Sequence, residues 1–176
     1  ADSDNPCGAG NQQERQPEML IVNRVDPAIG YYIAGFVDGE GSFTLKFRPR
    51  ADYATGWKVA LTFNVSQKDK VILCLIKKHL KCGTLFEKGG GVWMYEVNNL
   101  TALRDHVVPF FQRFGFLSGK KKRDFATFQK MLDLFLAGAH KRRDGIVELL
   151  RLRRGMNDGG KRKYSEEEIL ESLKSG

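Results

Sequence analysis

The sequence has little of what membrane proteins and disulfide-rich secreted scaffolds need. It has no uninterrupted apolar run near the ~20 residues of a membrane-spanning helix, and no apolar segment of a secretory signal at its N-terminus. It has only three cysteines, and none forms the close pair that zinc sites use. Because the number of cysteines is odd, disulfide bonds are not expected either. These absences favour a soluble intracellular protein without structural zinc.

Basic side chains outnumber acidic ones, so the chain carries a net positive charge. The 176 residues include 29 Lys and Arg against 21 Asp and Glu, which gives a net charge of +8. A chain of this length with 41% hydrophobic residues can bury a core as one domain. Excess positive charge favours a polyanionic partner or an anionic surface. The composition therefore predicts one folded domain that binds an acidic partner.

Hydrophobic periodicity predicts an α+β domain behind a polar leader. Residues 1–24 lack apolar periodicity and are expected to form a flexible leader, so the domain is expected to span 25–176. Alternating segments joined by short loops predict two β-hairpins in the order αββαββα, followed by further helices. Such an order favours one antiparallel sheet with helices packed on one face. The strands are expected at 42–50, 57–66, 84–88 and 92–97, and the helices near 26–39, 68–81, 99–113, 119–138, 144–154 and 165–174.

The side of the first hairpin that lies opposite its apolar residues is basic and polar. It carries cations and no acid, interleaved with hydroxyl and amide side chains. Phosphates need cations and base edges need hydrogen-bonding groups, so this mixture suits a β-ribbon in a major groove. A solvated face with lysines that prevent edge aggregation explains the same residues equally well. The residues of this hairpin that are expected to contact nucleic acid are Ser42, Thr44, Lys46, Arg48, Arg50, Lys58, Thr62, Asn64 and Ser66. Outside the hairpin, the same role is expected for Lys68, Lys88, Lys161, Arg162 and Lys163.

The first predicted helix ends on two carboxylates, in the segment Asp38-Gly39-Glu40-Gly41. The helix dipole disfavours negative charge at this end by ~0.3–1 kcal/mol per group, and orphan carbonyl oxygens collect there. Carboxylate and carbonyl oxygens are the environment that Mg²⁺ accepts, with water and phosphate as further ligands. The segment therefore indicates a candidate magnesium site. The alternative is that these acids are exposed turn residues or ion-pair partners of nearby lysines.

The same helix carries a stripe of small residues. Gly35 and Gly39 are four positions apart and Ala34 lies beside them, which allows a second helix to approach closely. If two copies of this helix crossed about a twofold axis, two Glu40 side chains would lie close together. A homodimer would then assemble a paired-carboxylate site that one chain does not contain.

The segment from Ile33 to Phe43, IAGFVDGEGSF, resembles the LAGLIDADG motif. Over roughly 26–174 the chain is similar to the single-motif homing endonucleases encoded in group I introns, with Gln67-Lys68, the LSGKKK segment around Lys120 and the stretch 157–165 at corresponding places. The resemblance implies a homodimer in which each subunit lays a curved antiparallel sheet on one DNA half-site. The implied dimer contacts are Tyr31, Ala34, Gly35, Asp38 and Gly39.

The resemblance also implies roles for single residues. Glu40 takes the place of the metal-binding acid and the Gly39 carbonyl that of a second ligand, for Mg²⁺ or for Mn²⁺ as a substitute. Gln67 and Lys120 match the polar and basic residues that order solvent near the scissile phosphate, and Asp38 matches a structural position. The sequence departs from the family in having Glu40 where Asp is frequent.

The resemblance leads us to expect a site-specific double-stranded DNA endonuclease that makes a staggered break. Leu136-Ala137-Gly138 begins like a second motif but lacks the acidic ending, so one motif per chain is expected. An intron maturase, which binds RNA as a splicing cofactor, and a catalytically silent DNA-binding regulator are the alternatives. The target sequence is not specified by these residues, and an organelle and a microbial cytoplasm are both compatible locations.

Overall fold

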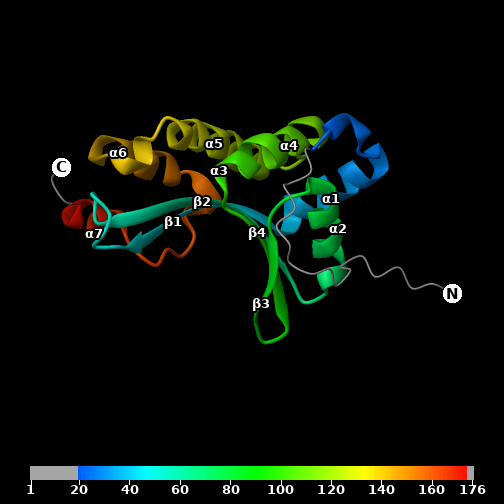
Figure 1. The fold of residues 1–176 in the computed structure, drawn as a ribbon, viewed down its shortest axis with the longest axis horizontal. Coiled ribbons are helices and arrows are strands. Elements are labelled where there is room, and N and C mark those ends of the chain that lie inside the picture. Colours follow the sequence, from blue (N-terminus) through cyan, green and yellow to red (C-terminus); the bar gives the residue numbers. More distant parts are fainter. Residues whose placement is uncertain (1–19, 174–176) are drawn as a thin grey trace. The chain divides into compact units, whose positions relative to one another are not determined.

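Residues 20–173 are described by a computed structural model, and within them a four-stranded sheet lies among helices (Figure 1). The strand order is β1-β2-β4-β3, and β4 pairs antiparallel with both β2 and β3. The α+β class and the order αββαββα are therefore confirmed. The elements are α1 Pro27–Glu40, β1 Gly41–Pro49, β2 Trp57–Gln67, α2 Lys70–Leu80, β3 Thr84–Gly89, β4 Val92–Val97, α3 Leu100–Ala102, α4 Val108–Phe114, α5 Gly119–Leu136, α6 Arg143–Arg153 and α7 Glu166–Ser172.

The described chain separates into two compact units. Unit 1 comprises residues 20–41 and 63–116, and unit 2 comprises residues 42–62 and 117–173. Strand β2 contributes residues to both units. The expectation of a single domain over 25–176 stays a prediction. Among residues 20–173, every helix falls short of the length and apolarity that a bilayer crossing requires.

Helix α1 of unit 1 begins where the sequence predicts and presents one face to the interior. The Asp26 carboxylate accepts hydrogen bonds from the backbone N–H groups of Ala28 (2.8 Å) and Ile29 (3.3 Å), and proline follows as the first helical residue. Glycine is needed at position 30, because a Cβ there would lie 2.3 Å from the ring of Phe114 in α4. The close approach of α1 and α4 therefore rests on one missing side chain.

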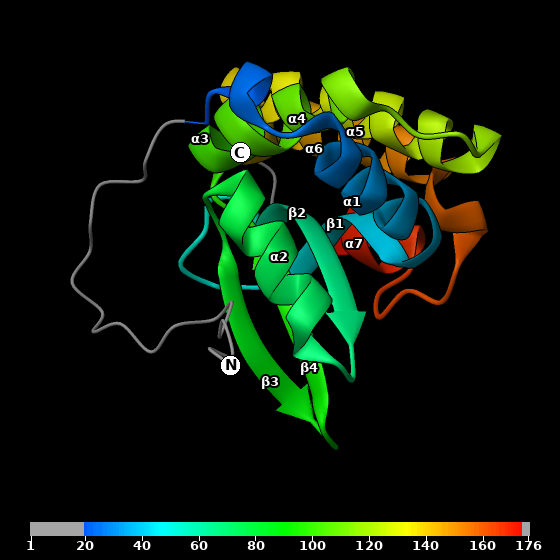
Figure 2. The same cartoon turned by 90° about the vertical axis from the view of Figure 1, so that its right-hand side faces the viewer.

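Helix α2 packs against the β3–β4 hairpin in unit 1 (Figure 2). The α2 side chains Leu73, Ile76 and Leu80 are fully buried, and so is Tyr95 of β4. The ring of Phe63 on β2 and the ring of Phe111 on α4 form an edge-to-face pair, with centroids 5.3 Å apart. These contacts form the apolar core of the unit.

The helix expected over 99–113 is broken in the structure. Its parts are α3, a π-helical turn at Leu103–Val107, and α4. Pro109 lies in the first turn of α4, and because proline has no N–H it cannot donate to the preceding turn. The wider turn before it absorbs this mismatch. The sequence prediction placed the helical segment correctly and missed the break.

Two expectations from the sequence are corrected in unit 1. Residues 20–24, assigned to the leader, belong to the folded part, because Leu20 is buried and the Arg113 guanidinium donates a hydrogen bond to the carbonyl of Val22. Residues 1–19 lie outside the described residues, so the leader prediction is untested there. Cys74 is disulfide-bonded, so the expectation of no disulfide was wrong. Cys82 is a free thiol whose pKa is raised to about 11 by burial.

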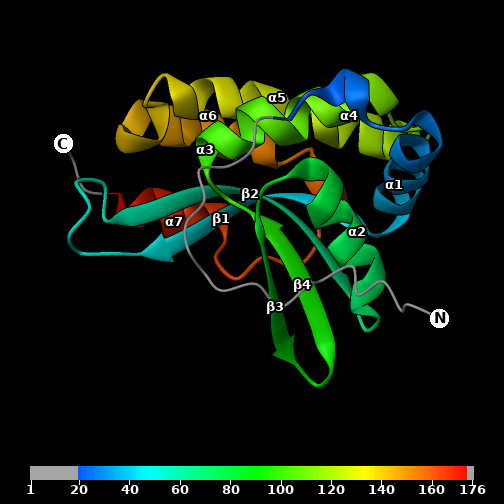
Figure 3. The same cartoon turned by 45° about the vertical axis from the view of Figure 1, so that its right-hand side comes forward.

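Unit 2 contains β1, the first half of β2, and helices α5 to α7. Phe43 of β1 packs on Phe125 and Phe128 of α5, with ring centroids 5.3 and 4.8 Å apart. Helix α6 packs along α5 (Figure 3). The indole of Trp57 in β2 donates a 3.0 Å hydrogen bond to the Ser172 hydroxyl of α7. These contacts cover one side of β1, and the residues that alternate with the covered ones are half-buried or exposed.

Candidate nucleic-acid interface

Strand β1 shows the alternation that the sequence predicts. Phe43, Leu45 and Phe47 are at most 6% exposed, whereas Lys46 is half-buried and Arg48 is exposed. Because successive side chains point to opposite faces, the buried aromatic residues fix the polar side chains on the uncovered side. The hydrophobic pattern thus determines on which side of the strand the cations lie.

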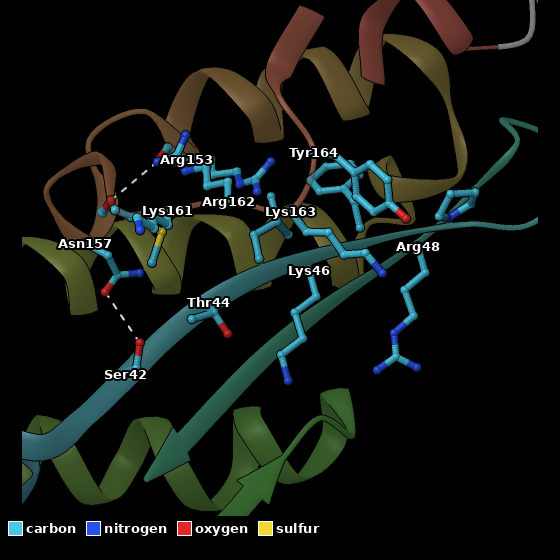
Figure 4. Close-up of a pocket in the computed structure, with 15 residues that line it drawn as sticks. Ser42, Thr44, Lys46, Arg48, Arg153, Asn157, Lys161, Arg162, Lys163 and Tyr164 are labelled. Atoms are coloured by element: carbon cyan, nitrogen blue, oxygen red, sulfur yellow. Dashed lines mark hydrogen bonds between the residues drawn. The ribbon is translucent and has the colours of Figure 1, made fainter. Parts of the chain in front are cut away.

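A pocket of about 680 Å³ lies between β1 and the segment 153–164, which begins at the last residue of α6, and side chains from both faces of β1 line it (Figure 4). Its lining contains six cations and no carboxylate. Like charges gathered without acids repel one another, so the arrangement favours an anion that lies among them. The structure thus brings together the predicted groups of β1 and of the late Gly-rich stretch. The charged lining residues are Lys46, Arg48, Arg153, Lys161, Arg162 and Lys163.

Asn157 attaches this late segment to β1. Its side-chain N–H donates a 2.9 Å hydrogen bond to the carbonyl of Phe43, and its backbone N–H donates to the Asp124 carboxylate at 3.2 Å. Ser42 donates a longer bond of 3.5 Å to the Asn157 side-chain oxygen. Sequence reasoning gave Asn157 no role, although asparagine next to glycines signals a turn with left-handed backbone. Asn157 has φ +52°, which confirms that signal.

Arg153 is a second pocket residue that sequence reasoning did not identify. Its side chain is 9% exposed and its guanidinium lies 5.2 Å from the ring centroid of Phe47. Burial, together with the nearby charge of Arg162, lowers the pKa of Arg153 to about 10, so it still carries its charge at neutral pH. Arg162 also donates a 2.6 Å hydrogen bond to the Arg153 carbonyl. The lining of the pocket therefore includes a largely buried arginine that packs on Phe47.

Other predicted contact residues lie in different surroundings. The Thr62 side chain is 1% exposed, so it does not reach the uncovered face and that expectation is corrected. Arg50 is exposed but is bonded to Asp52 through two nitrogens, at 2.8 and 2.7 Å. The remaining predicted residues keep at least part of their surface: Lys58, Lys68 and Lys88 are exposed, and Asn64 and Ser66 are half-buried.

The acidic end of α1 is accessible. Glu40 is the last helical residue and is exposed, and a Cβ added at Gly35 or Gly39 would meet nothing within 4 Å. Tyr31 on the same helix is 60% exposed, whereas Ala34 is 2% exposed, so Ala34 cannot offer a free surface to a second chain. Within residues 20–173, no three acid, His or Cys side chains gather as a metal site would require. Glu40 and the Gly39 carbonyl are thus hard-oxygen donors that form at most part of a magnesium site.

The other two predicted catalytic residues lie at element ends. Gln67 ends β2 opposite Trp93 in unit 1 and is partly exposed. Lys120 lies in the first turn of α5 in unit 2, and its ammonium is 2.8 Å from the Asp158 carboxylate. A hydrogen bond from Lys120 to Asp158 raises the pKa of Lys120 and lowers the pKa of Asp158.

Comparison with known proteins places this arrangement in a family. The family model described as LAGLIDADG endonuclease matches residues 33–132, which run from the second half of α1 through β1 to most of α5. The chain belongs to the LAGLIDADG endonuclease family. The resemblance seen in the motif around Gly35 and Glu40 is thereby confirmed.

Relatives in this family include archaeal and eukaryotic proteins. Homing endonuclease I-ApeII of Aeropyrum pernix is 30% identical over 81% of this chain and 88% of its own length. Probable intron-encoded endonuclease 2 of Neurospora crassa is 27% identical over 73% of this chain, which spans only 29% of that protein. The LAGLIDADG chain described here thus matches the archaeal relative almost throughout and the fungal one over less than a third of its length.

Solved structures of LAGLIDADG homing endonucleases share the fold. The archaeal intron-encoded homing endonuclease I-Vdi141I, in complex with DNA, superposes with a TM-score of 0.73 and 28% identity, over 81% of this chain and 92% of that one. The homing endonuclease I-TnaI gives a TM-score of 0.70 and 25% identity, over 84% and 95%.

Proposed function

We propose that this chain is a homing endonuclease that binds a specific double-stranded DNA site and hydrolyses one phosphodiester bond in each strand. The observation that carries the proposal is the pocket beside β1, where six cations and no acid line an open surface in a LAGLIDADG endonuclease fold. The DNA-bound relative I-Vdi141I, which shares 28% identity, supports DNA as the polyanion.

The residues of the pocket would bind the sugar-phosphate backbone. Lys46 and Arg48 extend from β1 and point away from the late segment, which carries Lys161 and Lys163 (Figure 4), and all four residues line the pocket. Each phosphate that a cation neutralises releases counterions, so binding should weaken steeply as salt rises. These contacts would fix the position of the protein on the duplex. Recognition of the DNA sequence would then depend on other side chains that contact the bases.

Hydrolysis would take place at the acidic end of α1. Glu40 and the Gly39 carbonyl would hold Mg²⁺, or Mn²⁺ in its place, because hard cations bind oxygen donors of this kind. When bound, the cation lowers the pKa of its water and stabilises the charge that develops on the phosphate oxygens. Within residues 20–173, no group of three acid, His or Cys side chains could fill the coordination sphere of the cation. Phosphate and water would therefore occupy the remaining coordination positions.

A homodimer would provide the second half of this site. The exposed side of α1 carries Tyr31, Gly35 and Gly39, and the two glycines leave the helix backbone uncovered. Two such helices can cross closely and bring two Glu40 side chains together, one for each strand of DNA.

The test is a search for cleaved sites. The full chain is incubated in Mg²⁺ with a plasmid library that carries random inserts, and double-strand ends are captured and sequenced. The proposal predicts a short set of related sites cut with a fixed stagger, and a dimer by ultracentrifugation. A splicing assay with precursor RNA runs in parallel, because enhanced splicing without DNA cutting would instead support the maturase alternative.

A further inference from the structure

Asp158 and Lys120 form an exposed ion pair that joins the turn after α6 to the first turn of α5. The carboxylate lies 2.8 Å from the ammonium, although the two side chains are 67% and 50% exposed. Exposed pairs of this kind contribute only ~0–1 kcal/mol to stability, so stability alone does not account for a dedicated contact. The backbone that presents Asp158 is the more informative feature.

Asp158 lies in a run of left-handed backbone. Asn157, Asp158 and Gly159 have φ of +52°, +50° and +70° in succession. For residues with a Cβ this conformation costs ~1–2 kcal/mol each, and it persists where neighbouring contacts fix it. Asn and Asp tolerate it better than other residues do. The chain therefore keeps a carboxylate at a position where glycine would be less strained.

The contacts that fix the turn connect it to two elements of unit 2. Asn157 donates hydrogen bonds to the Phe43 carbonyl of β1 and to the carboxylate of Asp124, which is 3% exposed on α5. Lys120 is on an equally anchored backbone, because the Ser118 hydroxyl caps α5 by accepting from the Lys121 N–H at 3.1 Å. Both partners of the ion pair are thus presented by fixed backbone.

We infer that Asp158 is a positioning residue for Lys120: it holds the ammonium in one orientation for the phosphate that Lys120 serves. The inference rests on the proposed function for the role of Lys120. Asp158 would touch neither DNA nor metal and would act through Lys120 alone. A carboxylate beside the ammonium also keeps it protonated, in agreement with the raised pKa of Lys120.

The first test compares cutting rates at saturating protein on a plasmid that the wild-type chain cuts. Asp158→Asn keeps the left-handed turn and removes the charge, and it should slow single-turnover cutting about tenfold, as loss of an orienting partner does elsewhere. DNA binding should stay equal or tighten, because a negative charge is removed. The matched control is Asp144→Asn, an exposed Asp in an ion pair with Arg142, which should cut at the wild-type rate.

The second test asks whether Asp158 acts through Lys120. In a Lys120→Met background, Asp158→Asn should cause no further loss, since the group it positions is gone. A further loss there would mean a structural role, and faster cutting by Asp158→Asn alone would mean that the pair restrains Lys120; either result overturns the inference. Asp158→Gly, which relieves backbone strain, should be as slow as Asp158→Asn.

The third test does not need cutting. The lysine amines of the full chain are labelled with ¹³C-methyl groups and titrated by NMR, and the Lys120 signal should titrate at lower pH in Asp158→Asn than in the wild type. An unchanged Lys120 titration overturns the inference alone. Absence of cutting by the wild type, with the Lys120 titration shifted as expected, overturns the proposed function while the Asp158–Lys120 contact stands.

Discussion

Two sheet surfaces of this molecule differ in chemistry although they belong to one set of strands. The basic surface, Lys46 and Arg48 of β1 with Arg153 and Lys161 to Lys163, gathers cations without acids in unit 2. The polar surface of unit 1 is set by strand register, which places Asn64 opposite Glu96 and Ser66 opposite Met94. On the β3 side of β4, Thr84 lies opposite Glu96 and Phe86 lies opposite Met94. The polar surface therefore continues onto β3, where it also includes the apolar side chain of Phe86.

The difference suggests that the two surfaces would have separate roles in DNA binding, one in affinity and the other in sequence recognition. Phosphates are the same at every base pair, so a surface of cations gives affinity and salt dependence but no sequence choice. Amide, hydroxyl and apolar groups can distinguish base edges. We therefore expect the basic surface to determine how tightly any DNA binds and the polar surface to determine which sites are cut.

The largest expected effect lies outside both surfaces, at the end of α1. Glu40→Gln removes the proposed metal-binding charge and should reduce cutting at least roughly 100-fold, since several kcal/mol of transition-state stabilisation are lost. Binding should change little, because neither surface is altered. Single-turnover cleavage and a gel-shift titration measure the two quantities, with Glu171→Gln, an exposed acid on α7, as the control. Near wild-type cutting by Glu40→Gln would falsify the metal assignment.

The comparison is tested next on the basic surface. Replacing Lys46 and Arg48 together by Ala should weaken binding about tenfold for every DNA sequence and reduce the slope of log K against log salt by ~2. Titrations at several salt concentrations with a specific and a random duplex measure this change. The control is the pair Lys130→Ala and Lys141→Ala, which removes two exposed charges elsewhere in unit 2. An unchanged salt slope would show that DNA does not lie on β1.

A smaller effect is expected from the anchor of the late segment. Asn157→Ala loses the side-chain bonds to the Phe43 carbonyl and the Ser42 hydroxyl and puts a less tolerant residue at φ +52°, so unfolding should become easier by about 1–3 kcal/mol. Asn157→Gly loses the side-chain bond but keeps the backbone conformation and should be affected less. Thermal unfolding of the three proteins checks this order, and equal melting temperatures would contradict it.

The smallest effect on affinity is expected on the polar surface. Asn64→Ala should change binding of the specific site by less than about tenfold and leave the salt slope unchanged, because no phosphate contact is lost. It should relax the preference at one base pair, where a good contact discriminates by ~1–3 kcal/mol. Sequencing of the sites that the variant cuts measures this preference. If the salt slope falls as it does for Lys46 and Arg48, the division between the two surfaces is wrong.

The predictions from sequence succeeded where a pattern is local. The alternation of β1 placed Lys46 and Arg48 on the uncovered side, and Asp26 with Pro27 marked the start of α1. They failed where burial depends on other elements. Thr62 follows the polar alternation yet is buried, and Ala34, expected at a dimer contact, is buried too. Neither position differs in sequence pattern from its exposed neighbours.

The sequence by itself determined the α+β order, the basic character and the motif that contains Gly35, Gly39 and Glu40, because periodicity, charge and local spacing need no distant contact. Only the tertiary structure decided that Arg153 packs on Phe47 and lines a pocket and that Asn157 attaches the late segment to β1. The physical reason is that hydrogen bonds and burial between residues far apart in the chain leave no periodic trace. The pairing of Lys120 with Asp158 belongs to the same class.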